Sequence, residues 1–546
     1  MAEIEDSVLG TNEDGSGDAL RGNRSVATQL VDMALGAYDL GISDADEPFV
    51  VKKGGPPVVH VLRGTQVSLR SELARDYYRV TGRVATQQAL TDAVATLEGI
   101  ARQQVPASLS LRVARQGDTL WLDLGCSRGR AVRIDAEGWQ VVDEPAVRFK
   151  RTPLTGELPT PVRGGQLDDL RAWVPAKPAD WPLVAAYLVA ALFPDIAHPV
   201  LGLFGEQGSG KTTAMKALTL VIDPGPVPIR KPPRDGDRWV TAASGSWVVA
   251  LDNLSAVQDW LSDTLCRAVT GEGDVRRRLY SDADLATFAF RRVVMLTGID
   301  LGSLNGDLAD RLLPVHLGRI QDSDRREETT MWGRAWQEAH PRILGAVLDL
   351  AVAVLGNMRI TSPPRMPRMA DFSRVLHAVD NVLGTRGLDC YLGVQGRLAA
   401  DTLSGDVFMV ALAEAIVTSF EGTAAEVLRK VTPTDEGWRK PKGWPASARF
   451  VTQRLRRHAP VLRQLGWEVD DDGGHNKSKS AQWVLVPPTP PEMANDLDPP
   501  DPPEPPQRHG RNGEVVQGGH GGSEVGGMGT LARQVTASDS RQEHVS

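Results

Sequence analysis

Hydrophobic and polar positions alternate with different periods along the chain, and each period predicts a different element. Apolar residues recur every three or four positions in three early segments, which predicts helices at 27–38, 69–78 and 88–101. Four short apolar stretches then follow, which predicts strands at 109–114, 119–124, 131–134 and 139–142. We therefore expect an α+β domain over residues 26–165, which ends in a linker rich in Pro and Gly.

The pattern changes after this linker. Strand-like and helix-like segments alternate over 166–322, which predicts a three-layer α/β domain with a parallel core sheet. Helical spacing dominates 323–420, where Pro341 separates two apolar segments. A smaller unit follows at 421–487. The ends, 1–25 and 488–546, are rich in Gly, Pro, Ser and acidic residues and are expected to be disordered.

Composition narrows the class of protein. The net charge is −8, but acidic residues are frequent in the two ends, so local basic surface decides whether nucleic acid can bind. The three cysteines lie far apart, which predicts neither a zinc site nor a disulfide framework. No basic secretory signal and no run of about eighteen apolar residues is visible. We therefore expect a cytoplasmic protein without a membrane partner.

One glycine-rich motif carries specific chemistry. It reads Gly-x4-Gly-Lys-Thr and comprises Gly205, Glu206, Gln207, Gly208, Ser209, Gly210, Lys211 and Thr212, followed by Thr213. An apolar run precedes it and a helix-favouring run follows, the setting of a phosphate-binding P-loop. Backbone N–H groups and the helix N-terminus would hold the phosphates of ATP. Lys211 would reach the β- and γ-phosphates, and Thr212 would ligate Mg²⁺.

Two further apolar strands are predicted to complete this site. The strand 247–251 ends at Asp252, for which we expect a role in holding Mg²⁺; the alternative is an ordinary turn. The strand 293–297 ends at Thr297, which could sense the γ-phosphate, orient water or merely end a strand. Arg311 follows. It could be an arginine finger that acts on a neighbouring subunit's ATP, or one half of a surface ion pair with Asp310.

The order of these motifs resembles the helicase and primase–helicase proteins of bacteriophages and integrated mobile elements, which are similar to superfamily 3 helicases of the AAA+ class. The resemblance covers about 200–320. It also includes Lys-Pro-Pro-Arg-Asp at 231–235, Leu-Asp-Asn-Leu-Ser at 251–255 and Asp-Leu-Ala-Asp-Arg at 307–311. It implies a P-loop NTPase core and a homo-oligomeric ring, possibly a hexamer. ATP would bind between subunits, and single-stranded DNA would pass through a central pore.

Within that resemblance, the segment 271–292 would carry the pore loops. Arg276, Arg277 and Arg278 would there neutralise DNA phosphates; the alternative is a solvated basic loop. Two positions depart from the family pattern. Asn253 stands where many AAA+ ATPases have a catalytic Glu, and Thr297 stands where relatives have Asn. An amide can orient water but cannot accept its proton, so Asn253 raises the question of slow hydrolysis.

The unit at 421–487 predicts two helices and then a β-hairpin, the layout of a winged helix. Its second helix carries basic residues that we expect to contact DNA, with a structural or protein-binding role as the alternative: Arg449, Arg454, Arg456 and Arg457.

These features predict a DNA-dependent ATPase, a helicase or replication initiator of a phage or mobile element. An ATP-dependent assembly switch with weak hydrolysis is the second class, and Asn253 favours it. A small-molecule phosphotransferase is the third. No persuasive primase site is visible, since Asp123 is a lone carboxylate that we interpret as structural.

Overall fold

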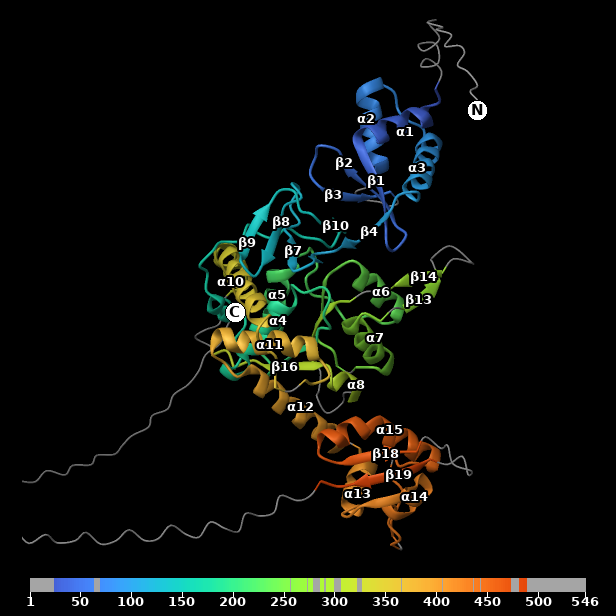
Figure 1. Cartoon of the computed structure of the whole chain (residues 1–546), viewed down its shortest axis with the longest axis vertical. Coiled ribbons are helices and arrows are strands. Elements are labelled where there is room, and N and C mark those ends of the chain that lie inside the picture. The colour runs from blue at the N-terminus through green and yellow to red at the C-terminus, as the bar shows by residue number, and fades with distance from the viewer. Residues whose placement is uncertain are drawn as a thin grey trace, which may run out of the picture. The chain divides into compact units, whose positions relative to one another are not determined.

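A computed structural model describes the chain between residues 24 and 488, apart from short gaps (Figure 1). The residues outside the description are 1–23, 63–68, 256, 273, 278–284, 289–290, 299–305, 322–326, 365, 405, 436, 442, 473–480 and 489–546. Nearly all of both ends that the sequence predicts to be disordered thus lie outside the described residues.

The first part of the described chain combines three helices with a six-stranded mixed sheet in the order β4-β1-β2-β3-β10-β5. The helices are α1 (Val26–Ala37), α2 (Leu69–Thr81) and α3 (Gln87–Ala101). The strands are β1 (Tyr38–Ser43), β2 (Pro48–Lys52), β3 (Val58–Val61), β4 (Pro106–Ala107), β5 (Leu109–Ser110) and β10 (Arg148–Lys150). The apolar stripes that predict the helices form one buried cluster, to which Leu30, Leu73 and Leu97 belong.

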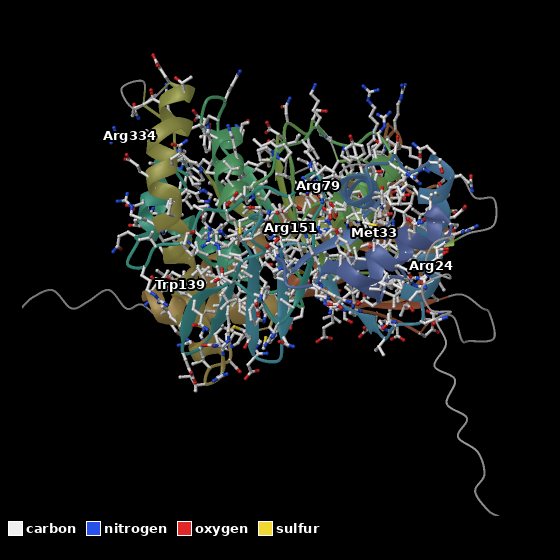
Figure 2. All side chains as sticks on the ribbon, turned by 90° about the horizontal axis from the view of Figure 1, so that it is seen from above. Arg24, Met33, Arg79, Trp139, Arg151 and Arg334 are labelled. Atoms are coloured by element: carbon white, nitrogen blue, oxygen red, sulfur yellow. The ribbon has the colours of Figure 1, made fainter. Side chains whose placement is uncertain are left out.

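A second sheet is antiparallel and runs β6-β7-β8-β9. Its strands are β6 (Val113–Gln116), β7 (Thr119–Asp123), β8 (Ala131–Asp135) and β9 (Gly138–Val142). Its apolar face shares a core cluster with helices that follow residue 180. The Trp139 indole (Figure 2) donates a 2.7 Å hydrogen bond to Asp349 Oδ1. The predicted boundary at residue 165 thus separates segments that share one core.

A four-stranded parallel sheet forms the centre of the next part, in the order β12-β15-β11-β16. Its strands are β11 (Val200–Phe204), β12 (Val248–Leu251), β15 (Val293–Thr297) and β16 (Leu312–His316). All but the last residues of β11 and β16 are buried, as expected for a parallel sheet covered on both faces. Arg230 adds an isolated parallel bridge to Leu251 at the β12 edge.

This part also contains a series of helices, of which the first four pack against the sheet. They are α4 (Trp181–Ala190), α5 (Lys211–Ile222), α6 (Gly236–Ser244), α7 (Asp259–Thr270), α8 (Gly306–Ala309), α9 (Glu328–Thr330), α10 (Trp336–Met358), α11 (Ala370–Leu383) and α12 (Gly387–Ser404). Short 3₁₀ turns at Leu167–Ala172 and Pro178–Asp180 precede α4, and a π-helical turn at Met331–Ala335 joins α9 to α10. A two-stranded ribbon, β13 (Asp274–Arg277) and β14 (Leu285–Phe288), lies between α7 and β15.

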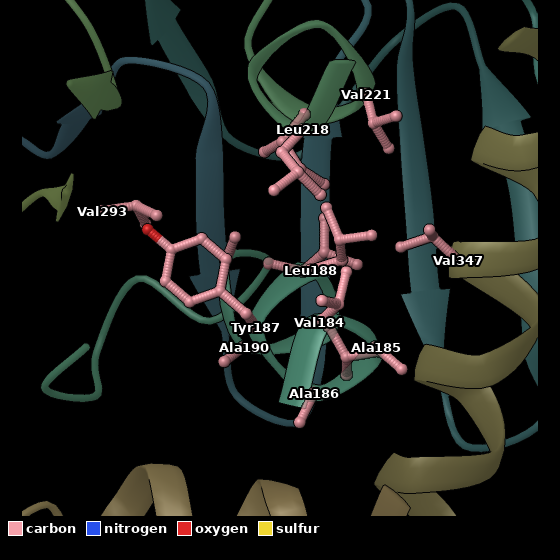
Figure 3. Close-up of a cluster of buried hydrophobic side chains, with 14 of the residues drawn as sticks. Val184, Ala185, Ala186, Tyr187, Leu188, Ala190, Leu218, Val221, Val293 and Val347 are labelled. Carbon is pink, nitrogen blue, oxygen red and sulfur yellow. The ribbon is translucent and has the colours of Figure 1, made fainter. Parts of the chain in front are cut away.

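The core of this part is centred on α4, whose ten residues are all buried. Figure 3 shows Val184 and Leu188 of α4 beside Leu218 of α5, with Val347 of α10 near them. The stretch Met331–Met358 is long and apolar enough to cross a membrane, but 67% of its most apolar window is buried inside the protein. Pro341, expected to separate two helices, lies within α10 instead.

The last described part is a small α+β unit with a three-stranded sheet in the order β17-β19-β18. Along the chain it comprises α13 (Val407–Ala415), β17 (Phe420–Thr423), α14 (Ala424–Val431), α15 (Ala448–Gln464), β18 (Glu468–Asp471) and β19 (Gln482–Val486). Its own core cluster includes Val451, Leu455 and Trp483. Thr423 and Glu426 start α14 with a capping box. Ser447 occupies the N-cap position of α15, but its side chain makes no capping hydrogen bond.

Candidate nucleotide-binding site

The glycine-rich segment lies where the sequence predicts it, between the carboxyl end of β11 and the amino end of α5. Gly208 and Gly210 have φ of 82° and 77°, a region that L side chains rarely adopt. A Cβ at Gly210 would lie 2.9 Å from Ile320 Cδ1, and one at Gly205 only 2.5 Å from Ser209 Oγ. The glycines are therefore needed both for the turn and for the close packing around it.

Lys211 is the first residue of α5 and folds back over the loop. Its Nζ donates hydrogen bonds of 2.8 Å to the carbonyl oxygens of Gly205 and Glu206. These two bonds hold the ammonium group above the loop at the positive end of the helix dipole. Both features favour an anion at this position.

Strand register explains why Asp252 and Thr297 meet beside the loop. Leu251 pairs with Leu296, and Thr297 pairs with Leu203, so the three strands end level with one another. Thr212 Oγ1 donates a 2.9 Å hydrogen bond to Asp252 Oδ2, and the Thr297 hydroxyl donates to Asp252 Oδ1. One carboxylate is thus held between the first turn of α5 and the end of β15.

The residue after Asp252 has an unusual backbone. Asn253 has φ of 61°, a conformation that costs free energy for a residue other than glycine. Its N–H donates to Thr297 Oγ1 at 2.9 Å, and the Leu254 N–H donates to the Thr297 carbonyl at 2.9 Å. The hydroxyl of Thr297 therefore fixes the backbone of Asn253 as well as the carboxylate of Asp252.

The other side of β11 carries a pair that the sequence pattern did not reveal. Asp180 Oδ2 accepts hydrogen bonds from the His316 backbone N–H at 2.7 Å and the His316 ring at 2.9 Å. Burial raises the pKa of Asp180, but the bonds from His316 outweigh it, so this pKa lies below its usual value. The His316 ring lies 5.8 Å from that of Phe204, the residue just before the loop.

Arg311 lies at the opposite end of the strands from the glycine-rich loop, just before β16 begins. Leu312, the next residue, pairs with Val200 at the start of β11, whereas the glycine-rich loop follows the end of that strand. Arg311 is only 7% exposed and forms a 2.6 Å ion pair with Asp307. Arg368 bridges Asp307 at 2.7 Å and Asp310 at 3.4 Å from the surface. The predicted pair of Arg311 with Asp310 is therefore replaced by one with Asp307.

Two models of known protein families match the sequence of this chain. A model described as "Actinomycete integrative conjugative element replication protein" matches residues 170–401, and the "AICE RepA C-terminal domain" matches 408–493. Together they cover more than half of the chain. The chain belongs to this family of replication proteins.

Several solved structures match this chain at low sequence identity. The apo structure of the NrS-1 C-terminal region is 12% identical, with 85% of this chain and 100% of that chain covered and a TM-score of 0.36. The SCCmec type IV Cch helicase is 12% identical, with coverages of 82% and 93% and a TM-score of 0.35. No curated protein matches the chain.

The predicted DNA-contacting arginines of this replication protein lie in two places. Arg276 and Arg277 belong to β13, while Arg278 lies outside the described residues. The other four lie on α15: Arg449, Arg454, Arg456 and Arg457. Arg454 Nε is 3.2 Å from Asp406 Oδ2, and Arg456 Nε is 2.8 Å from Asp471 Oδ2. Two of these four arginines are thus tied to carboxylates of their own domain.

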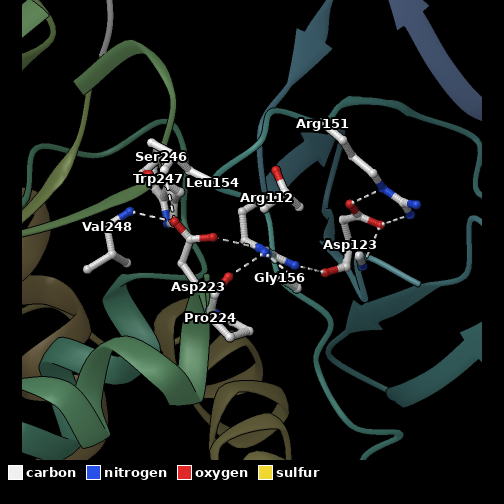
Figure 4. Close-up of polar contacts among 12 residues, drawn as sticks. Arg112, Asp123, Arg151, Leu154, Gly156, Asp223, Pro224, Ser246, Trp247 and Val248 are labelled. Atoms are coloured by element: carbon white, nitrogen blue, oxygen red, sulfur yellow. Dashed lines mark hydrogen bonds and ion pairs between the residues drawn. The ribbon is translucent and has the colours of Figure 1, made fainter. Parts of the chain in front are cut away.

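A buried polar network joins the second sheet to the nucleotide-site helix (Figure 4). Arg112 is 1% exposed and forms a 2.8 Å ion pair with Asp223, the residue that ends α5. Asp223 Oδ2 also accepts the N–H groups of Trp247 and Val248, where β12 begins. Asp123, interpreted from sequence as structural, is fully buried and pairs with Arg151 at 2.7 Å.

Proposed function

We propose that this replication protein is a P-loop ATPase of the AAA+ type that uses ATP and Mg²⁺ and acts on DNA. The observation that supports this most strongly is the side-chain cluster around Asp252, which joins the first turn of α5 to the end of β15. In open α/β sheets, ligands bind at the carboxyl ends of the strands, where the connections diverge. In this sheet β11 lies between β15 and β16, so the expected ligand site is at the carboxyl end of β11.

The residues present fit a magnesium ion. Thr212 and Asp252 offer a hydroxyl and a carboxylate 2.9 Å apart, and Mg²⁺ prefers oxygen ligands. Bound magnesium would neutralise charge on the phosphate oxygens. The N–H groups of the loop would hold the phosphates, and Lys211 would exchange its two carbonyl acceptors for phosphate oxygens. Thr297 would orient Asp252 and the backbone of Asn253.

We extend the proposal to a homo-oligomeric ring, possibly hexameric, through which single-stranded DNA passes. Arg276 and Arg277 on the β13–β14 ribbon would contact phosphates in that pore, together with Arg278. Arg311 lies at the amino ends of the strands, away from the nucleotide site of its own subunit. This position is compatible with a role at the nucleotide site of a neighbouring subunit. Because it is buried against Asp307, a finger role requires that this pair open on assembly. The C-terminal unit would be a winged helix that binds DNA.

One observation favours a second function, an ATP-dependent assembly switch with weak hydrolysis. The side chain after Asp252 is an amide, and an amide cannot accept a proton from water. Turnover would then depend on another carboxylate or be slow. ATP binding is common to both functions, whereas rapid turnover belongs only to the first.

Nucleotide binding is tested by titrating the full-length protein with ATP in the presence of Mg²⁺. Lys211→Ala should weaken binding about 10- to 100-fold, because hydrogen bonds to a charged group are lost. Lys216→Ala is the matched control. It removes the same charge one turn later on α5, where Nζ lies 4.2 Å from the centroid of the Trp332 ring, and it should leave affinity nearly unchanged. Equal affinity for the wild type and Lys211→Ala would contradict the proposed site.

A further inference from the structure

A cavity of about 340 Å³ lies beside α15 in the C-terminal unit. One side is formed by Trp444 and Pro445 of the segment before the helix. The other side is formed by one stripe of the helix: Phe450, Gln453, Arg454, Arg457 and His458. Their spacing of three or four residues places all five on the same helical face. A volume of this size lies at the lower end of the range of ligand pockets, about 300–1,000 Å³.

This stripe differs from the other two faces of α15. Val451, Leu455 and Leu462 face the core of the unit. Arg456 and Arg463 form ion pairs with Asp471 and Asp470, the residues at the end of β18. The sequence pattern treats the arginines of this helix as one group. The structure instead distributes them, and it places Arg454 and Arg457 at the cavity.

The cavity has a positively charged wall. Among the lining residues that the structure describes, Asp406 is the only acidic one, and its carboxylate is already engaged. It lies 3.2 Å from Arg454 Nε and 3.3 Å from His458 Nε2, and it accepts the N–H groups that start α13. His458 is 7% exposed, and its Nδ1 has no partner within the part of the chain that the structure describes. The wall thus combines cationic groups with an unpaired polar nitrogen.

The cavity also has an aromatic rim. Phe450 is 53% exposed, although a large apolar side chain gains by burial. The Trp444 ring, which also lines the cavity, makes edge contacts with Phe408 and Trp438, each 5.1 Å between centroids. An exposed aromatic ring next to arginine is the combination on which proteins stack the bases of single-stranded nucleic acid.

We propose that this cavity receives one unpaired nucleotide of single-stranded DNA, with its base on Phe450 and its phosphate near Arg457. The inference rests on the DNA partner proposed above and deepens it. A duplex offers only the edges of stacked bases to a helix in its groove. No base of a duplex would therefore enter the cavity beside α15. An unpaired base has a free face and can enter. Positive charge at the rim attracts the phosphates of either form.

The proposal is tested by fluorescence anisotropy with the full-length protein, without nucleotide, on a labelled single strand and its duplex. We expect the single strand to bind more tightly than the duplex. Phe450→Ala should weaken single-strand binding about 5- to 100-fold, and Phe450→Tyr should largely restore it. Because Phe450 is exposed, this change should leave the thermal unfolding midpoint nearly unchanged.

Arginine variants supply a second readout. Arg457→Ala should lower the slope of log affinity against log salt by about 0.7 for the single strand, as loss of one phosphate contact requires. Arg463→Ala removes the same charge from the far end of α15 and should leave the slope unchanged. The proposal is overturned if Phe450→Ala binds the single strand as the wild type does, or if the duplex binds more tightly. ATP binding that depends on Lys211 is measured separately, so failure here leaves the nucleotide site untouched.

Discussion

At the scale of single residues, the hydroxyl of Thr297 contacts two neighbouring residues of the nucleotide site at once. It accepts the Asn253 N–H and donates to Asp252, so one side chain fixes two neighbours. The sequence predicts that Thr297 ends a buried strand, because the apolar run before it is unambiguous. It does not predict the bond to Asn253, because that bond depends on the φ of 61° at Asn253, which the apolar pattern does not reveal.

Thr297→Val tests this position, since valine keeps the shape of threonine but removes the hydroxyl. We expect turnover of ATP to fall about 10- to 100-fold, the usual cost of losing a group that orients a metal ligand. ATP affinity should change much less, because the loop and Lys211 are intact. Thr297→Ser keeps the hydroxyl and should retain most of the activity. The measurement is steady-state kcat and KM at several Mg²⁺ concentrations. Equal values for Thr297→Val and Thr297→Ser would contradict a role for the hydroxyl.

At the scale of elements, the strand–loop–helix unit at β11 and α5 is predictable from sequence because its signals are local. The buried network at Asp223 is not, because Arg112 lies 111 residues away along the chain. The same holds for the second sheet, whose apolar face shares a core with α10. Periodicity identifies its strands, but it contains no information about the partner on which they pack. The stripes of α15 are likewise distinguished by β18, whose Asp470 and Asp471 pair with only some of the arginines of the helix.

Arg112→Met tests whether the network stabilises these elements together. Removal of one partner from a buried ion pair typically costs about 3–5 kcal/mol, because the other charge stays buried. Arg112 also donates to the carbonyls of Asp123 and Gly156, which would lose a partner. We expect a clear fall in the free energy of unfolding. It is measured by denaturant titration, with tryptophan fluorescence as the signal. Arg359→Met breaks an exposed pair with Asp118 and should cost at most about 1 kcal/mol. Equal costs would contradict a structural role for the network.

At the scale of the whole molecule, the family assignment joins the α/β core and the C-terminal unit in one replication protein. The proposed nucleotide site lies in the first and the cavity beside α15 in the second. A motor requires that ATP turnover be coupled to DNA, whereas a switch requires only that ATP be bound. The nature of residue 253 makes this distinction the central one. An amide beside Asp252 favours the switch, and the basic ribbon with the C-terminal cavity favours the motor.

The most direct measurement is ATP turnover by the full-length protein, with and without single-stranded DNA, beside Lys211→Ala. We expect turnover that rises when DNA is added and is lost in the variant. ATP binding without turnover in either condition would contradict a DNA-dependent motor and identify the protein as a switch. Turnover that persists in Lys211→Ala would contradict the nucleotide site itself.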